Sequence, residues 1–249
     1  MTTRKNTYFL SDFHLGARYL GDEKEHERRI VAFLESVKDD AREIYLLGDI
    51  LDYWFEYKYV VPRGFVRFFG KLAELTDAGV KIYWFIGNHD IWIFDYLPNE
   101  LGVEVIDGSL VKEICGKVFY MTHGDGVGRT PRSFKLLRSF FRNKFCQKLY
   151  SGIHPRWTIP FALGWSHTSR AGDTMPPFGA NEPLEEFAKN YQSKPEVDYF
   201  IFGHRHVAIN KVINEKSRMI ILGDWINEYT YAVFDGTNVT LKKWQNPRP

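Results

Sequence analysis

One stretch of the chain reads Val80-Lys81-Ile82-Tyr83-Trp84-Phe85-Ile86-Gly87-Asn88-His89-Asp90. Its first seven residues are rich in β-branched and aromatic side chains, which is typical of a buried strand. Gly87 and Asn88 then favour a tight turn. The turn brings an amide, an imidazole and a carboxylate to the carboxyl end of a strand, where open α/β sheets bind their ligands. This stretch therefore predicts an α/β fold with a functional site at one sheet edge.

Four other short hydrophobic runs end in the same way. Each reads as a strand and is followed at once by Asp or His side chains: Tyr8-Phe9-Leu10 by Ser11-Asp12-Phe13-His14, Ile44-Tyr45-Leu46-Leu47 by Gly48-Asp49-Ile50-Leu51-Asp52, Phe119-Tyr120-Met121-Thr122 by His123-Gly124-Asp125, and Tyr199-Phe200-Ile201-Phe202 by Gly203-His204-Arg205-His206. Because the carboxyl ends of parallel strands meet at one edge of a sheet, these runs predict a single site assembled from the whole chain.

Further helices and strands are expected between and after these runs. Apolar residues at helical spacing predict helices over 22–40, 66–78 and 182–192, and a short helix over 91–101 interrupted at Pro98. Residues 103–106, 109–114 and 117–121 are expected to form successive strands. Residues 209–213, 219–222, 230–234 and 239–244 are expected to form strands that pair mostly as antiparallel hairpins. The aromatic residues Tyr53, Trp54 and Phe55 suit either the core or the wall of a cleft.

Charge is unevenly distributed along the chain. The 249 residues carry 33 Lys and Arg against 31 Asp and Glu, yet residues 126–172 hold nine Lys and Arg and no acidic residue. Within that segment, residues 133–150 place Phe and Leu near one face of a predicted helix and Arg and Lys on the other. We therefore expect one domain over 1–249 with a basic, aromatic helical lid inserted over 130–183. The apolar face of its helix either packs on the body or contacts a lipid or an anionic bilayer.

The overall composition favours a soluble globular protein. Hydrophobic residues make up 44% and charged residues 26% of the chain, which is ordinary for that class. Cys115 and Cys146 form no disulfide or metal-ligand pattern, so a reducing cytoplasm is expected. The N-terminal residues lack the apolar core of a signal peptide, and no apolar run approaches the ~20 residues of a membrane-spanning helix. Any contact with a membrane is therefore expected to be peripheral.

The polar residues at the strand ends form a candidate set of metal ligands. They offer carboxylate, amide and imidazole atoms without a thiolate, which suits Mn²⁺, Fe²⁺, Zn²⁺ or Mg²⁺: Asp12, His14, Asp49, Asn88, His123, His204 and His206. One ion rarely takes seven protein ligands, whereas two ions can share them if one carboxylate bridges. Two ions ~3.5–4 Å apart can activate water and hold both oxygens of an in-line phosphoryl displacement.

The five motifs, in this order, resemble those of the calcineurin-like metallophosphoesterases. They are Asp12-x-His14, Gly48-Asp49-x-x-Asp52, Gly87-Asn88-His89-Asp90, His123-Gly124-Asp125 and Gly203-His204-x-His206. The resemblance implies an α/β fold, a four-layer αββα sandwich of two mixed sheets, with a dinuclear metal centre. It also implies that Asp49 bridges the two ions, with one ion held by Asp12, His14 and His206 and the other by Asn88, His123 and His204.

The same resemblance implies catalytic roles for two further residues. His89 would face the phosphate and protonate or stabilise the leaving oxygen. Asp52 would orient that imidazole through a carboxylate–imidazole hydrogen bond. Other interpretations are that His89 is a turn residue satisfied by its neighbours and that Asp52 is a turn or helix cap.

Further features are similar to a branch of this family that acts in bacterial lipid A synthesis. They are the basic insertion, Ser11-Asp12-Phe13-His14-Leu15-Gly16, Gly48-Asp49-Ile50-Leu51-Asp52-Tyr53-Trp54-Phe55 and Ile221-Leu222-Gly223-Asp224-Trp225. The branch implies hydrolysis of the pyrophosphate bond of UDP-2,3-diacylglucosamine to UMP and 2,3-diacylglucosamine 1-phosphate. It further implies two divalent metal ions as cofactors, with Mn²⁺ favoured. It also implies that the protein lies on the cytoplasmic face of the inner membrane. The branch usually has Arg at the position of His89. Ser166 and Arg170 are candidate substrate contacts in the lid.

Two other functions are compatible with the same residues. A metallophosphodiesterase or phosphatase would act on another nucleotide or phosphoester, and activity on phosphopeptides or cyclic nucleotides would favour it. A nuclease-like protein would use the basic segment to bind nucleic acid. The positive charge is confined to one insertion rather than a groove across the fold, so a nucleic-acid partner is not expected.

Overall fold

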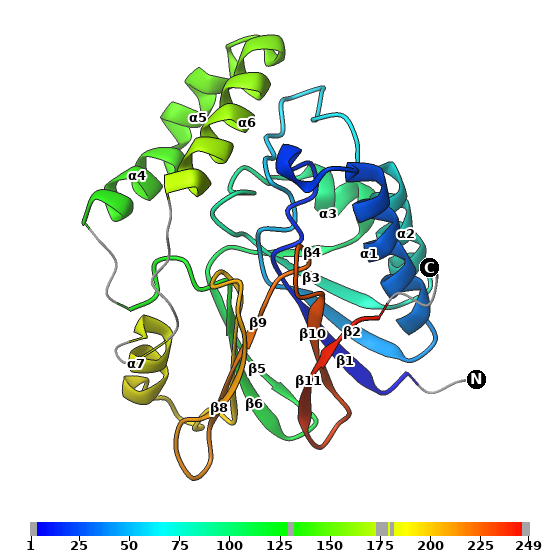
Figure 1. Ribbon diagram of the computed structural model, residues 1–249, viewed down its shortest axis with the longest axis vertical. Helices are drawn as coiled ribbons and strands as arrows, with labels where there is room; N and C mark the ends of the chain where they lie inside the picture. The colour runs from blue at the N-terminus through cyan, green and yellow to red at the C-terminus, as the bar shows by residue number, and fades with distance from the viewer. Residues whose placement is uncertain (1–3, 129–131, 173–178, 180–181, 246–249) are drawn as a thin grey trace.

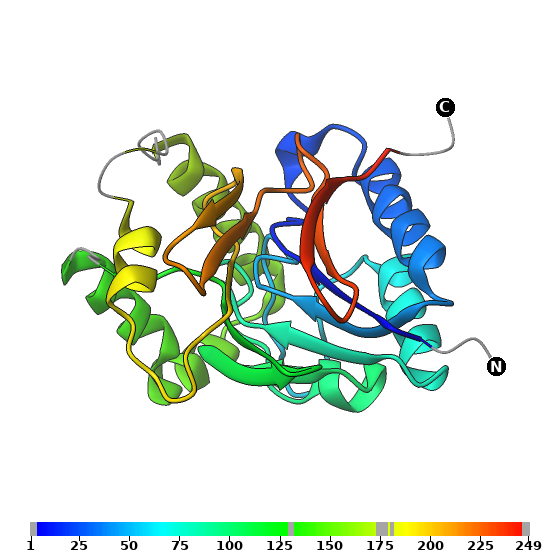
Figure 2. The same cartoon turned by 90° about the horizontal axis from the view of Figure 1, so that it is seen from below.

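The protein consists of two β-sheets packed face to face, with helices on both outer faces (Figures 1 and 2). This computed structural model describes residues 4–128, 132–172, 179 and 182–245, and it describes their side chains except at 18, 132–135 and 165–172. The layers follow the order helix, sheet, sheet, helix. The predicted four-layer arrangement of two mixed sheets is therefore confirmed.

The first sheet has six strands in the order β11-β10-β1-β2-β3-β4. Their bounds are β1 (Asn6–Leu10), β2 (Ala41–Leu46), β3 (Lys81–Phe85), β4 (Glu104–Ile106), β10 (Thr230–Phe234) and β11 (Val239–Lys243). Strands β1 to β4 run parallel, whereas β10 is antiparallel to β1. On the outer face lie α1 (Glu23–Val37), α2 (Val66–Asp77) and α3 (Tyr96–Leu101), with the short 3-10 turn η1 (Arg18–Leu20) before α1.

The second sheet has five strands in the order β5-β6-β7-β9-β8. Their bounds are β5 (Ser109–Ile114), β6 (Lys117–Thr122), β7 (Tyr199–Phe202), β8 (Ala208–Val212) and β9 (Arg218–Leu222). Strands β6, β7 and β9 are parallel, and β5 and β8 are antiparallel edges. Helix α7 (Pro183–Asn190) covers the outer face. Because both faces of each sheet are covered, the strands are hydrophobic on both sides, which explains their near-continuous apolar runs.

Side chains of successive strand residues enter different layers of the core. On β1, Tyr8 and Leu10 pack against the helices of the first sheet, whereas Phe9 points between the sheets and stacks on Tyr45 and Phe119. A third apolar cluster lies between the second sheet and α7. This period-2 alternation fixes the register of the strands and therefore the positions of the residues at their ends.

Three helices lie apart from the two sheets, beyond the ends of the strands (Figure 1). They are α4 (Arg132–Arg142), α5 (Lys144–Ser151) and α6 (Pro155–Gly172). A single helix over 133–150 was expected, and this expectation is wrong. The chain leaves the helical conformation at Asn143, whose side chain accepts hydrogen bonds from the amides of Phe145 and Cys146 and so begins a new helix.

The expectation of a helix over 91–101 broken at Pro98 is also wrong. The helix begins only at Tyr96, and Pro98 lies within its first turn, where the missing amide hydrogen costs nothing. The preceding residues are held by the buried carboxylate of Glu56, which accepts hydrogen bonds from the amides of Phe94, Asp95 and Tyr96. A side chain distant in sequence therefore sets where this helix begins.

Candidate metal centre

The strand ends meet where the carboxyl edges of the two sheets adjoin. Asp12 and His14 follow β1, Asp49 follows β2, Asn88 and His89 follow β3, His123 follows β6, and His204 and His206 follow β7. The structure therefore brings the candidate ligands together. Three overlapping groups each have ligand atoms within 4.8 Å of one another: Asp12, His14 and His206; His14, Asp49 and His89; and Asp49, His123 and His204.

Glycines next to the ligands allow this close approach. A Cβ atom added to Gly203 would lie 2.7 Å from Oδ2 of Asp12, and one added to Gly48 would lie 2.7 Å from the ring of His123. A Cβ atom at Gly87 would collide with both the carboxylate and the backbone of Asp49. The Gly-Asp, Gly-Asn and Gly-His pairs in the sequence are thus a packing requirement of the site.

The backbone at the ligands is held in an unusual conformation. Eight non-glycine residues in the described chain have positive φ, and five of them are predicted ligands: Asp12, His14, Asp49, His204 and His206. Residues other than glycine seldom adopt this left-handed region, although Asn, Asp and His do so more often than the rest, and the strain costs free energy. Such strain is concentrated at functional sites, where the surrounding structure holds it in place.

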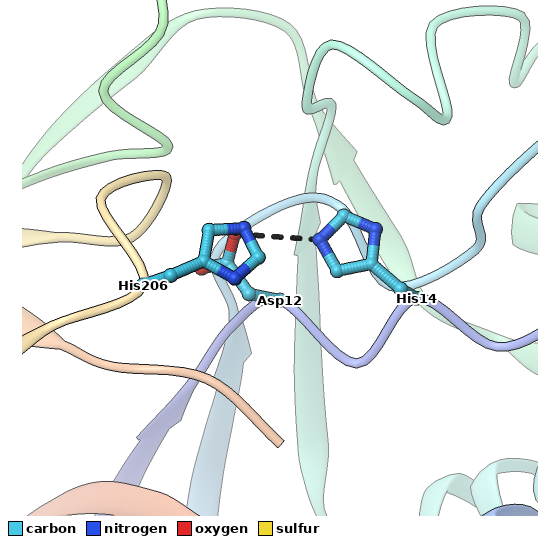
Figure 3. A group of neighbouring side chains, drawn as sticks. All are labelled: Asp12, His14 and His206. Carbon is cyan, nitrogen blue, oxygen red and sulfur yellow. Dashed lines mark ion pairs between the residues drawn. The ribbon is translucent and has the colours of Figure 1, made fainter. Parts of the chain in front are cut away.

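The first group joins the end of β1 to the loop before β8. In Figure 3 the side chains of Asp12, His14 and His206 point toward one another. Oδ1 of Asp12 lies 3.7 Å from Nε2 of His14 and 3.3 Å from Nε2 of His206, and the two imidazole rings are stacked with centroids 5.1 Å apart. One oxygen and two nitrogen atoms thus face a common space.

The second group is linked to the first by Asp49. Its Oδ2 lies 3.4 Å from Nε2 of His123 and 3.8 Å from Nε2 of His14, so this carboxylate touches both groups. Its Oδ1 accepts a hydrogen bond from the amide of His89. Oδ1 of Asn88 lies 3.2 Å from Nε2 of His123, which adds a neutral oxygen to the second group. The arrangement is consistent with a dinuclear site.

His89 and Asp52 lie beside the first group. Nδ1 of His89 lies 3.2 Å from the backbone carbonyl oxygen of Asp52 and 3.6 Å from its carboxylate. The same carboxylate lies 3.5 Å from Nδ1 of His14. Asp52 therefore stands between two imidazoles, and its backbone makes the closer contact with His89. The ring of His89 is 13% exposed and lines a cavity described below.

Electrostatics at the centre reflect crowding of buried charges. Burial raises the pKa of Asp12. Burial also acts against ionisation of Asp49, but the imidazoles of His123 and His89 hold the pKa of this carboxyl well below its usual range. Burial would lower the pKa of His123, yet the neighbouring Asp49 raises it well above the usual value. Burial and the positive charge of His123 lower the pKa of His204 to about 3.

These residues fit divalent metal ions. Oδ1 of Asp12 is buried and, among the described residues, accepts no hydrogen bond, although it faces two imidazole nitrogens. The other oxygen, Oδ2, accepts a hydrogen bond from the amide of His204, and a buried carboxylate oxygen left without a hydrogen bond is costly unless a cation faces it. His204 is held neutral by its surroundings, as a metal ligand must be. The donor set of oxygen and imidazole nitrogen suits metals of intermediate hardness.

The outer nitrogen atoms of two imidazoles are held by protein oxygens. Nδ1 of His123 lies 2.7 Å from the carbonyl oxygen of Leu47, and Nδ1 of His206 lies 3.3 Å from Oδ2 of Asp224. Such contacts fix the ring tautomer and direct Nε2 toward a metal. Asp224 was not among the predicted site residues, although it follows a hydrophobic run, Ile220-Ile221-Leu222, in the same way as the others.

Asp90 is a second residue missing from the predicted set. Its fully buried carboxylate accepts hydrogen bonds from the amides of Ile50 and Gly87 and from the indole of Trp84. Burial raises its pKa to about 6. The carboxylate ties the turn that carries Asn88 and His89 to the turn that carries Asp49. The last residue of the Gly-Asn-His-Asp motif is therefore structural.

A cavity of about 350 Å³ opens from the centre toward the separate helices. Its charged or strongly polar lining residues are Asp52, Asn88, His89 and Arg138. Its other walls are apolar or aromatic: Tyr53, Ile91, Trp92, Leu137, Phe140, Phe141, Tyr150, Phe161 and Ala162. A mainly apolar site with a few polar groups is typical of ligand pockets.

The aromatic run after Asp52 divides between core and cavity. Trp54 and Phe55 are buried, whereas Tyr53 lines the cavity and its hydroxyl lies 3.1 Å from that of Tyr150 on α5. The indole of Trp92 donates to the carbonyl oxygen of Phe141 on α4. The separate helices are thus held to the body by aromatic contacts around the cavity. Ser166 and Arg170 belong to α6, but their side chains lie outside the described part of the structure.

None of the described helices combines the length and the apolarity needed to cross a membrane. Several apolar side chains of the three separate helices are nevertheless exposed to solvent, including Leu136, Phe140, Phe145, Leu149, Trp157 and Phe161. Single exposed apolar residues are ordinary, whereas a group of them on adjoining elements indicates an interaction surface.

Several known proteins are similar to this chain in sequence or in fold. The UDP-2,3-diacylglucosamine hydrolase of Porphyromonas gingivalis is 44% identical over 259 residues, covering 98% of this chain and 99% of that protein. The enzyme of the same name from Neisseria meningitidis serogroup A is 26% identical, covering 90% and 92%. A solved structure of Vps29 with Zn²⁺ from Entamoeba histolytica has a TM-score of 0.46 and 12% identity, covering 95% and 89%.

A family description also matches most of the chain. The calcineurin-like phosphoesterase family matches residues 5–208, a range that contains every candidate ligand. The match includes the Asp12-x-His14, Gly48-Asp49, Gly87-Asn88-His89-Asp90, His123 and Gly203-His204-x-His206 motifs that form the centre. The predicted family is therefore confirmed, and the chain belongs to the calcineurin-like phosphoesterases.

Proposed function

We propose that this protein hydrolyses the pyrophosphate bond of UDP-2,3-diacylglucosamine, giving UMP and 2,3-diacylglucosamine 1-phosphate, a step of lipid A biosynthesis. The observation that carries the proposal is the apolar cavity that begins at Asn88 and His89. A doubly acylated UDP-sugar requires a phosphoryl-transfer centre and an adjoining space for hydrocarbon. The 44% identical relative from P. gingivalis, similar over nearly its whole length, supports the same substrate.

The metal-binding part of the proposal uses the two groups of ligands. Asp12, His14 and His206 would hold one ion, and Asn88, His123 and His204 would hold the other. Asp49 would bridge the two, because its Oδ2 lies within 4 Å of Nε2 of both His14 and His123. When bound, two divalent ions, with Mn²⁺ favoured for these donors, supply charge neutralisation and a lower pKa for the attacking water.

The chain's own residues supply the remaining steps. His89 faces the cavity beside the ligands, where its imidazole would stabilise or protonate the oxygen that leaves. The backbone carbonyl of Asp52 accepts from Nδ1 of His89 when that nitrogen is protonated, which directs Nε2 away from Asp52. The carboxylate of Asp52 lies 3.6 Å from the same nitrogen and so helps to orient the ring. The apolar walls exclude water and so strengthen these interactions.

The acyl chains would occupy the apolar part of the cavity. Phe140 and Phe141 of α4, Tyr150 of α5 and Phe161 of α6 line it with Trp92 of the body, so all three separate helices contribute. These helices would act as a lid inserted into a single phosphoesterase domain. The cavity thus offers polar residues beside the candidate ligands for a diphosphate and apolar walls for acyl chains.

The exposed side of the lid would dock on an anionic membrane surface. Phe145 and Trp157 are each 69% exposed, and the segment around them is basic. Apolar and basic residues on one helical element are the combination that binds the interface of anionic bilayers. We therefore place the protein in the cytoplasm as a peripheral protein of the inner membrane, where its lipid substrate is found.

A panel of substrates tests the proposal. Purified protein reconstituted with Mn²⁺ is assayed on UDP-2,3-diacylglucosamine in mixed micelles, on UDP-N-acetylglucosamine, which lacks the long acyl chains, and on bis(p-nitrophenyl) phosphate. The proposal predicts release of UMP with a kcat/KM for the acylated substrate at least about 100-fold above that for UDP-N-acetylglucosamine. Metal-dependent cleavage of the aryl phosphodiester without UMP release from the lipid would instead indicate another phosphoester substrate.

A further inference from the structure

Arg138 lies on α4 and pairs with Asp125, two residues after the candidate ligand His123. It lines the cavity together with Asp52, Asn88 and His89. Among the described lining residues, it is the one whose side chain carries a permanent positive charge. Its side chain is 28% exposed, so it is accessible from the cavity and partly shielded from bulk solvent.

A buried carboxylate holds Arg138 in this position. Nε of Arg138 lies 3.2 Å from Oδ2 of Asp125, whose side chain is only 3% exposed. Asp125 follows β6 two residues after His123, so the ion pair links α4 directly to a ligand-bearing strand end. Nη1 of Arg138 lies against the backbone at Gly126, where an added Cβ atom would come within 2.7 Å of it. The guanidinium is thus held against the body by its ion pair with Asp125 and by close packing on the backbone at Gly126.

The positive charge of Arg138 is placed where it could bind a phosphate of a diphosphate substrate. A substrate whose reacting phosphorus lies at the ligand groups and whose acyl chains lie along Phe140 and Phe161 must place its second phosphate between them. Arg138 lines this cavity and pairs with Asp125, two residues after the candidate ligand His123, so its guanidinium lies on the side of the cavity toward the ligands. A guanidinium offers five N–H donors in a planar fork, which suits phosphate oxygens, and apolar walls nearby strengthen the interaction.

We propose that Arg138 binds the phosphate that remains on the sugar and stabilises it as the leaving group. This inference rests on the proposed function. In the reaction, an oxygen–phosphorus bond forms between water and the uridine-side phosphorus, and the bond from that phosphorus to the bridging oxygen breaks. The bridging oxygen leaves with the electron pair on the sugar-side phosphate. The two hydrogens of the water go to the new phosphate monoesters or to solvent as these ionise.

A second arginine of the same helix provides a matched control. Arg142 lies one turn after Arg138 on α4 and forms an ion pair with Asp107 of the body. It is not among the described residues that line the cavity. Both arginines therefore tether α4 through an Asp, but only Arg138 reaches the substrate space. Asp125 is buried whereas Asp107 is 58% exposed, so Arg142→Ala controls for the loss of a tether on α4, and inhibition by the sugar phosphate distinguishes substrate binding from a structural role of Arg138.

The experiment compares wild type, Arg138→Ala, Arg138→Lys and Arg142→Ala, each loaded with Mn²⁺. It measures kcat and KM for UMP release from UDP-2,3-diacylglucosamine and product inhibition by UMP and by 2,3-diacylglucosamine 1-phosphate. Hydrolysis of bis(p-nitrophenyl) phosphate, which has no second phosphate, and thermal unfolding are the parallel readouts. The Lys variant retains charge without the planar fork and keeps the comparison informative if Arg138→Ala folds poorly.

We expect Arg138→Ala to lose about 100-fold in kcat/KM for the lipid substrate. It should also bind 2,3-diacylglucosamine 1-phosphate at least about tenfold more weakly, with UMP inhibition and aryl phosphodiester hydrolysis changed less than about threefold. Arg138→Lys should be intermediate, and Arg142→Ala within about threefold of wild type. Equal losses in Arg138→Ala and Arg142→Ala, or unchanged inhibition by the sugar phosphate, would overturn the assignment. A wild type that releases no UMP would overturn the proposed function and this inference with it.

Discussion

Oδ2 of Asp224 lies 3.3 Å from Nδ1 of His206, while Nε2 of the same imidazole lies 3.3 Å from Oδ1 of Asp12. His206 therefore spans two carboxylates, one at each ring nitrogen. The other oxygen of Asp224 accepts hydrogen bonds from the amides of Ile226, Asn227 and Glu228, so the carboxylate is itself held by the backbone. The ring orientation of a candidate metal ligand is thus determined by a residue outside the ligand set.

Replacing Asp224 by Asn should weaken metal binding without removing a ligand. Three backbone amides hold Oδ1 of Asp224, so the Asn variant would turn its NH2 group, a donor, toward Nδ1 of His206 and no longer accept a hydrogen bond there. Contacts of this kind are worth about 10–100-fold in metal affinity. Titration of the metal-free protein with Mn²⁺, followed by calorimetry, measures the effect. Asp235→Asn, a change to an exposed carboxylate that caps the turn before β11, is the control. Equal affinities in wild type and Asp224→Asn would contradict the role given to Asp224.

Replacing Gly87 by Ala should disrupt the centre. The added methyl group would collide with the carboxylate of Asp49, which the two ligand groups share, so we expect activity to fall at least about 100-fold. Gly70 lies exposed on α2 with no atom within 4 Å of an added Cβ, and Gly70→Ala should leave activity unchanged and stabilise the protein by about 0.5–1 kcal/mol. Kinetics and urea unfolding of both variants provide the measurement. Full activity in Gly87→Ala would show that Asp49 does not need this close approach.

Adding charge to the exposed side of the lid should weaken membrane binding. We expect the double variant Phe145→Asp and Trp157→Asp to bind anionic phosphatidylglycerol vesicles at least about tenfold more weakly than wild type, because it loses apolar contact and gains repulsion. Cosedimentation with vesicles measures this. Val212, 56% exposed on β8, is a matched site in the second sheet, and Val212→Asp should bind normally. Equal binding of all three proteins would exclude docking through the lid.

Stability should depend on pH through Glu185 on α7. Its carboxylate accepts hydrogen bonds from Lys189 and Lys211, each at 2.7 Å, and these bonds lower its pKa. A carboxyl whose pKa is lowered by folding stabilises the protein fully above its ordinary value of about 4.5, and the contribution is lost as the pH falls through the lowered pKa. Glu185→Gln should therefore be less stable than wild type at pH 7, by up to about 1 kcal/mol. Urea unfolding at pH 7 and pH 3 should show this difference shrinking at the lower pH, and a constant difference would contradict the assignment.

The sequence was sufficient to predict most of the fold and the set of residues at the centre. Strands covered on both faces have continuous hydrophobic runs, and the residues that follow them gather because the strands are parallel. Glycines beside Asp49, Asn88 and His204 are visible in the sequence and are required by the close packing of the turns. The sequence pattern thus predicts both that these residues gather at one edge and which ligand atoms they offer.

Asp224 was not predicted as a site residue because the sequence did not predict the pairing of β9. Residues 219–222 were expected to pair mostly as an antiparallel hairpin, which would direct their carboxyl end away from the site. β9 does pair antiparallel with β8, but it also pairs in parallel with β7, so its end lies at the same edge as His204 and His206. The hydrophobic pattern of a strand buried between two others does not depend on whether its neighbours run parallel or antiparallel to it. Hydrophobic periodicity therefore could not predict the parallel pairing of β9 with β7.

Other errors arose where a distant side chain decides the local structure. The start of α3 depends on Glu56, and the break between α4 and α5 depends on the cap formed by Asn143. Similarly, the spacing of residues along the chain does not predict the ion pair of Arg138 with Asp125. Contacts of this kind depend on the packed fold, and local propensity is a weak guide to them.

We propose that this chain hydrolyses UDP-2,3-diacylglucosamine at a two-metal centre bridged by Asp49. The most direct measurement is release of UMP from this lipid in mixed micelles as metal-free protein is titrated with Mn²⁺, for wild type, Asp49→Asn and His89→Ala. We predict activity that saturates at two ions per wild-type chain, is lost in Asp49→Asn, and falls about 10²–10⁴-fold in His89→Ala with both ions still bound. Saturation at one ion, or an Asp49→Asn variant as active as wild type, would contradict a two-metal centre bridged by Asp49.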